Sequence, residues 1–105
     1  MGADVFFTRA TGSDANAAFA SEVDDASYES GHGGYTGTIA EKHSFVLIAV
    51  PDTFEASQPD VDARARRYAE SLIEASDPRV NDKWGPAGCI AVKPGTFLFF
   101  GWASS

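Results

Sequence analysis

Residues 31–43, GHGGYTGTIAEKH, carry more side chains capable of chemistry than any other part of the chain. An unperturbed histidine side chain titrates near neutral pH and a glutamate can accept a proton, so His32 and Glu41 could transfer protons to and from a bound substrate. Four polar side chains in or beside the segment could orient such a substrate: Tyr28, Tyr35, Thr36 and Thr38. Lys42 could hold an anionic group. One prediction is therefore a small enzyme or an anionic-ligand-binding domain.

The segment fits no established phosphate or metal motif. Gly31 and Gly33 begin a G-x-G-x-x-G pattern, but Thr36 occupies the position of the third glycine, and the segment leads from a helix into a strand. His32 and His43 could join Glu41 on a zinc ion, yet their spacing matches no known ligand pattern. We therefore expect no nucleotide, no metal and no other cofactor.

Two further interpretations of the segment are open. The glycines could simply let the chain leave a helix and enter a hairpin. Alternatively, the segment and the loop NDKWGPAG form a contact surface, and we take this as the leading hypothesis: a small soluble accessory protein that binds a protein partner or a ligand. The residues expected to make this contact are His32, Gly34, Tyr35, Thr36, Thr38, Glu41, Lys42 and Trp84.

The charge balance limits the class of partner. With 15 acidic and 8 basic residues, the formal net charge is −7. Binding to nucleic acid depends on Lys and Arg that neutralise phosphates, so we expect no direct nucleic-acid binding. A second alternative is mimicry of nucleic acid by the acidic helix face formed by Glu22, Asp25 and Glu29, although such faces are usually only solvated.

The cysteine content and the apolar runs indicate where the protein works. Cys89 is the only cysteine, which excludes an intramolecular disulfide and favours a reducing compartment. No window approaches the roughly 20 apolar residues of a membrane span. We expect a cytoplasmic protein without membrane contact, with Cys89 as a small buried residue rather than a nucleophile. The oligomeric state is left open.

Hydrophobic periodicity predicts the elements. A strand over 5–8 is followed by a helix that Ser13 caps and Gly31 ends, with apolar residues stepping along one face. Residues 35–41 and the run FVLIAV at 45–50 are expected to pair as a hairpin, the run being a central strand. Ser57 and Asp60 cap a second helix with an apolar stripe from Val61 to Ala75. A final hairpin turns at KPGT.

The order of these elements is β-α-β-β-α-β-β within a single domain, residues 1–105. We expect an α+β fold in which two helices pack on one face of a mainly antiparallel sheet of four to five strands. This arrangement is a variant of the ferredoxin-like pattern.

Three phrases resemble a group of short uncharacterised proteins from high-GC bacteria, haloarchaea and their viruses: YESGHGGYTGTIAEK at 28–42, KWGPAG at 83–88 and LFFGWAS at 98–104. The resemblance brings no activity with it. It implies that the three phrases belong together, and it suggests a phage or mobile-element context.

Overall fold

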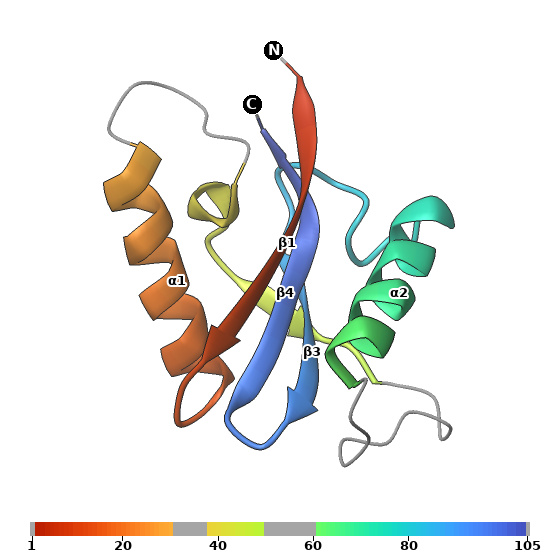
Figure 1. The fold of residues 1–105 in the computed structure, drawn as a ribbon. Coiled ribbons are helices and arrows are strands. Elements are labelled where there is room, and N and C mark those ends of the chain that lie inside the picture. The colour runs from red at the N-terminus through yellow and green to blue at the C-terminus, as the bar shows by residue number, and fades with distance from the viewer. Residues whose placement is uncertain (1, 31–37, 50–60, 105) are drawn as a thin grey trace.

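The computed structural model describes residues 2–30, 38–49 and 61–104 of the chain. Its elements in chain order are β1 (Ala3–Thr11), α1 (Ala15–Ser30), the short 3-10 helix η1 (Ile39–Glu41), β2 (Phe45–Leu47), α2 (Val61–Glu74), β3 (Ala87–Lys93) and β4 (Thr96–Ser104). The predicted α+β fold, with two helices and a four-stranded sheet, is confirmed (Figure 1).

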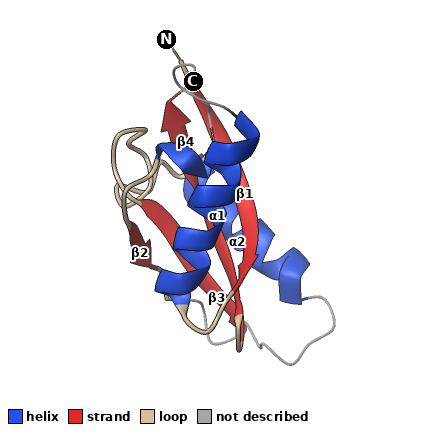
Figure 2. Ribbon diagram, turned by 90° about the vertical axis from the view of Figure 1, so that its left-hand side faces the viewer, coloured by secondary structure: helices blue, strands red, loops and turns tan. Residues whose placement is uncertain are grey.

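The four strands lie in the order β1-β4-β3-β2. β1 is antiparallel to β4 along its whole length, and β4 is antiparallel to β3. The β3–β4 pair is the predicted hairpin, and its turn contains Gly95 at φ +78°, a conformation that glycine adopts without steric cost. β2 pairs with β3 in parallel, with Phe45 opposite Ala87. The sheet is therefore mixed, and β1 and β2 form its two edges (Figure 2).

The helices cover opposite faces of the sheet, so the expectation that both pack on one face is wrong. In Figure 1, α1 and α2 flank the sheet from either side. Side chains that alternate along β4 confirm this: Phe99 belongs to the core cluster under α1, and Leu98 and Phe100 belong to the cluster under α2. The fold thus has three layers and departs from the ferredoxin-like pattern in this respect.

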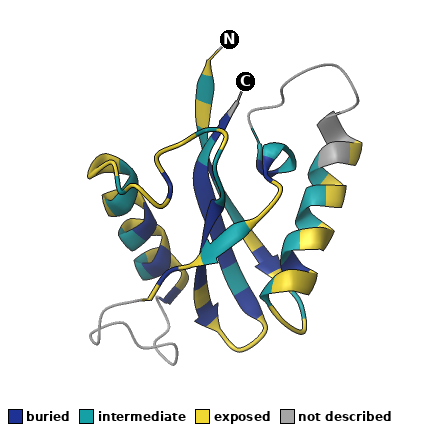
Figure 3. Ribbon diagram, turned by 180° about the vertical axis from the view of Figure 1, so that it is seen from behind, coloured by how far each residue is buried: buried dark blue, intermediate teal, exposed yellow. Residues whose placement is uncertain are grey.

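The composition of β3 and β4 explains the three layers. Residues on both faces of these strands are buried, as Cys89 and Ile90 illustrate on β3 (Figure 3). A strand with one wet face alternates between apolar and polar residues, whereas the unbroken apolar runs of this hairpin need a cover on each side. The hydrophobic free energy of burying both faces therefore favours one helix per face over two on the same face.

Three predictions about residues 35–50 are wrong for the described residues 38–49. Instead of a strand, residues 39–41 form η1, because the Thr38 hydroxyl accepts a hydrogen bond from the Ala40 amide at 3.2 Å and Ile39 is buried against the α1 side of the core. The strand formed within the run, β2 at Phe45–Leu47, lies at an edge of the sheet rather than at its centre. Residues 38–41, the described part of the first segment, do not pair with β2, which pairs with β3 instead.

The start of α1 and the apolar stripe of α2 lie within the described residues. The Asp14 carboxylate, rather than the predicted Ser13 hydroxyl, accepts the hydrogen bond of the Ala17 amide at 2.8 Å and caps α1. The apolar stripe of α2 is confirmed, with Val61, Ala65 and Ala69 buried. The proposed roles of Gly31, Ser57 and Asp60 at the helix ends lie outside the described residues. Among the described helices, none combines the length and apolar character needed to cross a membrane.

Candidate functional site

Lys42 directly follows η1 in the chain, and its side chain contacts the loop that leads into β3. Its side chain is buried, with 2% of its surface exposed. The ammonium group donates hydrogen bonds to the carbonyl oxygens of Asp82 at 3.2 Å, Lys83 at 3.3 Å and Gly85 at 2.8 Å. These three bonds use every donor that a lysine ammonium has. Lys42 therefore fixes the backbone of residues 82–85.

The electrostatic setting of Lys42 agrees with a structural role. Burial lowers its pKa below the ordinary value, and the negative charge of Asp82 partly offsets this effect. A buried ammonium is costly unless it is hydrogen-bonded, and the three carbonyl oxygens supply that compensation. The expected contact between Lys42 and an anionic ligand does not fit this burial, because the ammonium has neither solvent access nor a free donor.

The loop that Lys42 fixes presents Trp84. The Gly85 amide donates to the Asp82 carbonyl at 3.0 Å, and the Trp84 amide donates to the Asp82 carboxylate at 2.9 Å. The loop is therefore stabilised by its own hydrogen bonds as well as by those from Lys42. The Lys83 ammonium lies 5.4 Å from the centre of the Trp84 ring. Trp84 itself is 61% exposed, an unusual position for so large an apolar side chain.

η1 lies immediately before Lys42 in the chain. The Lys42 amide donates to the Ile39 carbonyl at 2.9 Å, which closes the turn directly onto the buried lysine. Ile39 is buried, and Thr38 and Glu41 are partly exposed. The Thr38 hydroxyl acts as the cap of η1. Thr38, one of the predicted contact residues, therefore stabilises the start of η1, a role that the sequence did not indicate.

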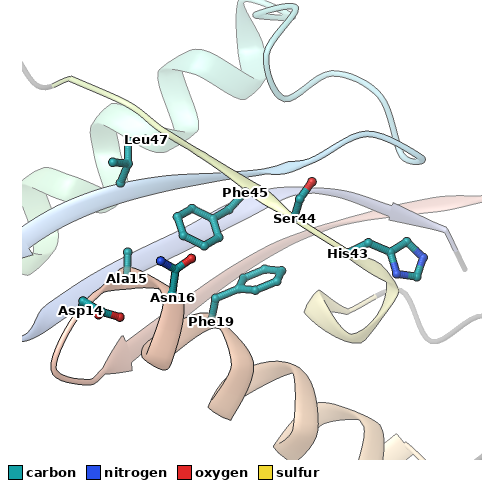
Figure 4. Close-up of a pocket in the computed structure, with 8 residues that line it drawn as sticks. All are labelled: Asp14, Ala15, Asn16, Phe19, His43, Ser44, Phe45 and Leu47. Carbon is teal, nitrogen blue, oxygen red and sulfur yellow. The ribbon is translucent and has the colours of Figure 1, made fainter.

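An open hollow of about 630 Å³ lies between the start of α1 and the edge strand β2. Its lining residues are Asp14, Ala15, Asn16, Phe19, His43, Ser44, Phe45 and Leu47. Figure 4 shows Asn16 and Phe19 of α1 beside the ring of Phe45, and His43 at the end of the row farthest from Asp14. Beneath the hollow, the rings of Phe19, Phe45 and Phe99 pack with centroids 5.1 to 5.5 Å apart. Its floor is therefore rigid and aromatic.

A second hollow, of about 290 Å³, lies between β1 and α2. The two arginines that line it, Arg9 and Arg66, both form ion pairs with carboxylates of α2. Arg9 pairs with Asp62 at 2.9 Å, and Arg66 lies 4.6 Å from the centre of the Phe7 ring while it pairs with Glu70 at 3.2 Å. Arg66 and Glu70 have the i,i+4 spacing that brings opposite charges together on a helix. Because these cations have acidic partners, the hollow is a weaker candidate for binding an anion.

The remaining predicted residues divide by their position. His32, Gly34, Tyr35 and Thr36 lie outside the described residues, so the expected proximity of His32 and Glu41 stays a prediction. Within 2–30, 38–49 and 61–104, no three His, Cys, Asp or Glu side chains come close enough to hold a metal ion. Cys89 is fully buried, as predicted, and burial raises the pKa of its thiol to about 11.

The hollow beside β2 was not predicted from the sequence. Asn16 of α1, His43 of the segment before β2 and Leu47 of β2 line it, and the sequence did not place these parts of the chain together. The apolar run at 45–50 was the one sequence feature that could have indicated this hollow. Because we interpreted the run as a central strand, we expected Leu47 to be buried, whereas it is exposed. Only the strand order reveals that the run lies at an edge.

Comparison of the chain with models of protein families, with curated protein sequences and with solved structures gives no match. The function is therefore argued from the geometry of the described residues.

Proposed function

We propose that this protein is a small binding module that contacts a partner protein through Trp84 and the partly exposed residues Thr38 and Glu41 of the neighbouring turn. One observation carries the proposal. Trp84 is 61% exposed although its loop is held by the buried ammonium of Lys42 and by the Asp82 side chain. An apolar ring on a mobile loop would lose conformational freedom on binding, whereas a ring on a fixed loop loses little.

The identity of the side chain supports the same conclusion. Tryptophan is enriched among the residues that contribute most to protein–protein binding, because it buries a large apolar area and also has an N–H donor. Lys83 lies beside the ring and offers a cationic contact at the rim. A catalytic role has no comparable support, since His32 is outside the described residues and Lys42 is committed to backbone carbonyls.

The test is a comparison of wild type with Trp84→Ala. A partner is first captured from the native host with the wild-type protein and identified by mass spectrometry. Its affinity for the purified proteins is then measured by calorimetry. We expect Trp84→Ala to weaken binding by at least about tenfold, which corresponds to a loss of about 1.4 kcal/mol.

The matched control is Tyr28→Ala, which removes another exposed aromatic ring, 91% exposed on α1. We expect this variant to bind as the wild type does. Equal affinities for wild type and Trp84→Ala, with both proteins folded by circular dichroism, would overturn the proposal.

A further inference from the structure

The outer edge of β2 presents backbone groups for pairing. On its inner side, the Ser44 carbonyl accepts from the Ala87 amide at 3.0 Å and the Ile48 amide donates to the Cys89 carbonyl at 2.9 Å. In a parallel pair, alternate residues direct their N–H and C=O groups to the same neighbour, so those of Phe45 and Leu47 point away from β3. No strand in the described part of the chain pairs with this outer side.

The side chains of the same two residues line the α1–β2 hollow. Phe45 belongs to the core cluster under α1, and Leu47 shares its face because side chains alternate along a strand. Leu47 is 67% exposed. An extended segment added to β2 would therefore form backbone hydrogen bonds at the edge and direct every second side chain toward the hollow. This geometry is that of binding by strand addition, in which side-chain pockets beside the edge provide specificity.

The charge around the hollow indicates the chemistry of the segment. Asp14 lines the hollow at the start of α1. Between Arg9 and Lys42 the sequence contains no lysine or arginine, and α1 carries Glu22, Asp24 and Asp25. With a net charge of −7, the protein attracts cationic segments and repels anionic ones.

We infer that the β2 edge binds an extended, basic peptide segment of another protein, which pairs with Phe45–Leu47 and places an apolar side chain in the α1–β2 hollow. This inference concerns a surface other than Trp84 and does not rest on the function proposed above. Affinity would come from the backbone hydrogen bonds and from apolar contact with Leu47, Phe45 and Phe19, and the lysine or arginine side chains would provide selectivity.

The probe is the acetylated and amidated peptide Lys-Val-Lys-Phe-Lys-Val-Lys, titrated into isotope-labelled protein and followed by NMR. We expect the amide signals of Phe45 and Leu47 to shift and their hydrogen exchange to slow. A peptide with Glu in place of every Lys should bind at least about tenfold more weakly. No shift at the β2 amides with the lysine peptide would overturn the inference.

Two N-methylated versions of the lysine peptide test strand addition itself. One carries methyl groups on the first, third, fifth and seventh residues and the other on the second, fourth and sixth. Only one set of amides can face β2, so we expect one version to lose binding and the other to keep it. Equal affinities for the two versions would mean docking without backbone pairing, which contradicts the inference.

Protein variants separate the surfaces. Leu47→Ser should weaken binding of the lysine peptide by about tenfold, since it removes an exposed side chain without disturbing the core. Tyr28→Ser and Trp84→Ala should leave this binding unchanged. If Trp84→Ala abolishes it instead, the peptide occupies the Trp84 loop and the assignment to β2 is wrong. If sedimentation shows a dimer that Leu47→Ser dissociates, a second copy of the chain covers the edge and the inference also fails.

Discussion

The ammonium group of Lys42 donates a 2.8 Å hydrogen bond to the carbonyl oxygen of Gly85. This bond and its two companions to Asp82 and Lys83 join the turn before β2 to the loop before β3. Since β2 and β3 then run in parallel from this junction, one buried lysine sets both the start of the parallel pair and the position of Trp84.

Replacing Lys42 with methionine tests this role. Lys42→Met keeps an apolar stem of similar length but removes the ammonium that donates to the carbonyl oxygens of Lys83 and Gly85, while the Asp82 carbonyl keeps the Gly85 amide as a donor. We expect the free energy of unfolding to fall by about 1 to 3 kcal/mol, because the charge-assisted hydrogen bonds that hold the loop are lost without replacement. Urea denaturation measures the change. Lys93→Met, at an exposed position of β3, is the control and should have a small effect.

The fluorescence of Trp84 gives a second readout for Lys42→Met. In a Trp102→Phe background, Trp84 is the only tryptophan. We expect its anisotropy to fall when Lys42 is replaced, because the loop loses its anchor. An unchanged anisotropy together with unchanged stability would contradict the role assigned to Lys42.

Gly88 is required by the close approach of an aromatic ring. A Cβ atom at this position would lie 2.6 Å from Cζ of Phe100 and 2.9 Å from Cγ1 of Val80, closer than packed atoms can approach. Phe100 is fully buried, so its ring has little room to move. We expect Gly88→Ala to destabilise the protein by about 1 to 3 kcal/mol in urea denaturation.

The control for Gly88→Ala is Ala91→Ser, a substitution at an exposed position of the same strand. It should shift the free energy of unfolding by no more than about 0.5 kcal/mol. A Gly88→Ala variant as stable as the control would show that the sheet can relax around the added methyl group.

Asp77 gives the protein an acid-dependent stability. Hydrogen bonds from the side chain and the amide of Arg79 lower the pKa of this carboxyl from 3.8 to about 2. Between these two values the unfolded chain binds a proton more readily than the folded chain does, so stability falls as the pH falls from about 4 to about 2. Asp77→Asn should remove this part of the pH dependence of Tm.

The pH experiment needs a carboxylate control. Asp4→Asn removes a carboxylate from an exposed position of β1. We expect this variant to keep the fall in Tm between pH 4 and pH 2 that Asp77 causes. If Asp77→Asn and wild type show the same dependence on pH, the Asp77–Arg79 pair does not contribute to stability.

Cys89 should report on global unfolding. The thiol is fully buried and its pKa is raised to about 11, so the reactive thiolate is scarce and inaccessible in the native state. We expect a thiol reagent at pH 8 to label native Cys89 at least about 100-fold more slowly than the urea-unfolded chain. A Cys89→Ala variant that also carries Ser13→Cys, at an exposed site, should react promptly. Equal rates for the two native proteins would contradict the burial.

Some elements could be predicted because their signals are local. The β3–β4 hairpin follows from two apolar runs around Pro94 and Gly95, and the α2 stripe follows from its spacing of three and four residues. The strand predicted over 35–41 from its β-branched composition is wrong for residues 39–41, which form η1. The cap of Thr38 on Ala40 and the burial of Ile39 outweighed that propensity for residues 39–41.

The candidate surfaces were predictable only in part. The sequence analysis placed Trp84 on the contact surface, and the structure shows its side chain 61% exposed. The role of Lys42 could not be predicted, because its carbonyl partners are about forty residues away in the chain. The hollow beside β2 could not be predicted either, since it depends on which strand lies at the edge.

The sequence by itself determined the class of fold and the approximate positions of the main helices and strands, because hydrophobic periodicity and turn residues act over short distances. The unbroken apolar runs of β3 and β4 carried a signal for burial on both faces, but the sequence-based expectation placed both helices on one face, and the structure shows otherwise. Only the tertiary structure decided which helix covers each face, that β2 is a parallel edge strand, and that the Lys42 ammonium is buried. These features arise from contacts between residues far apart in the chain, which no local pattern encodes.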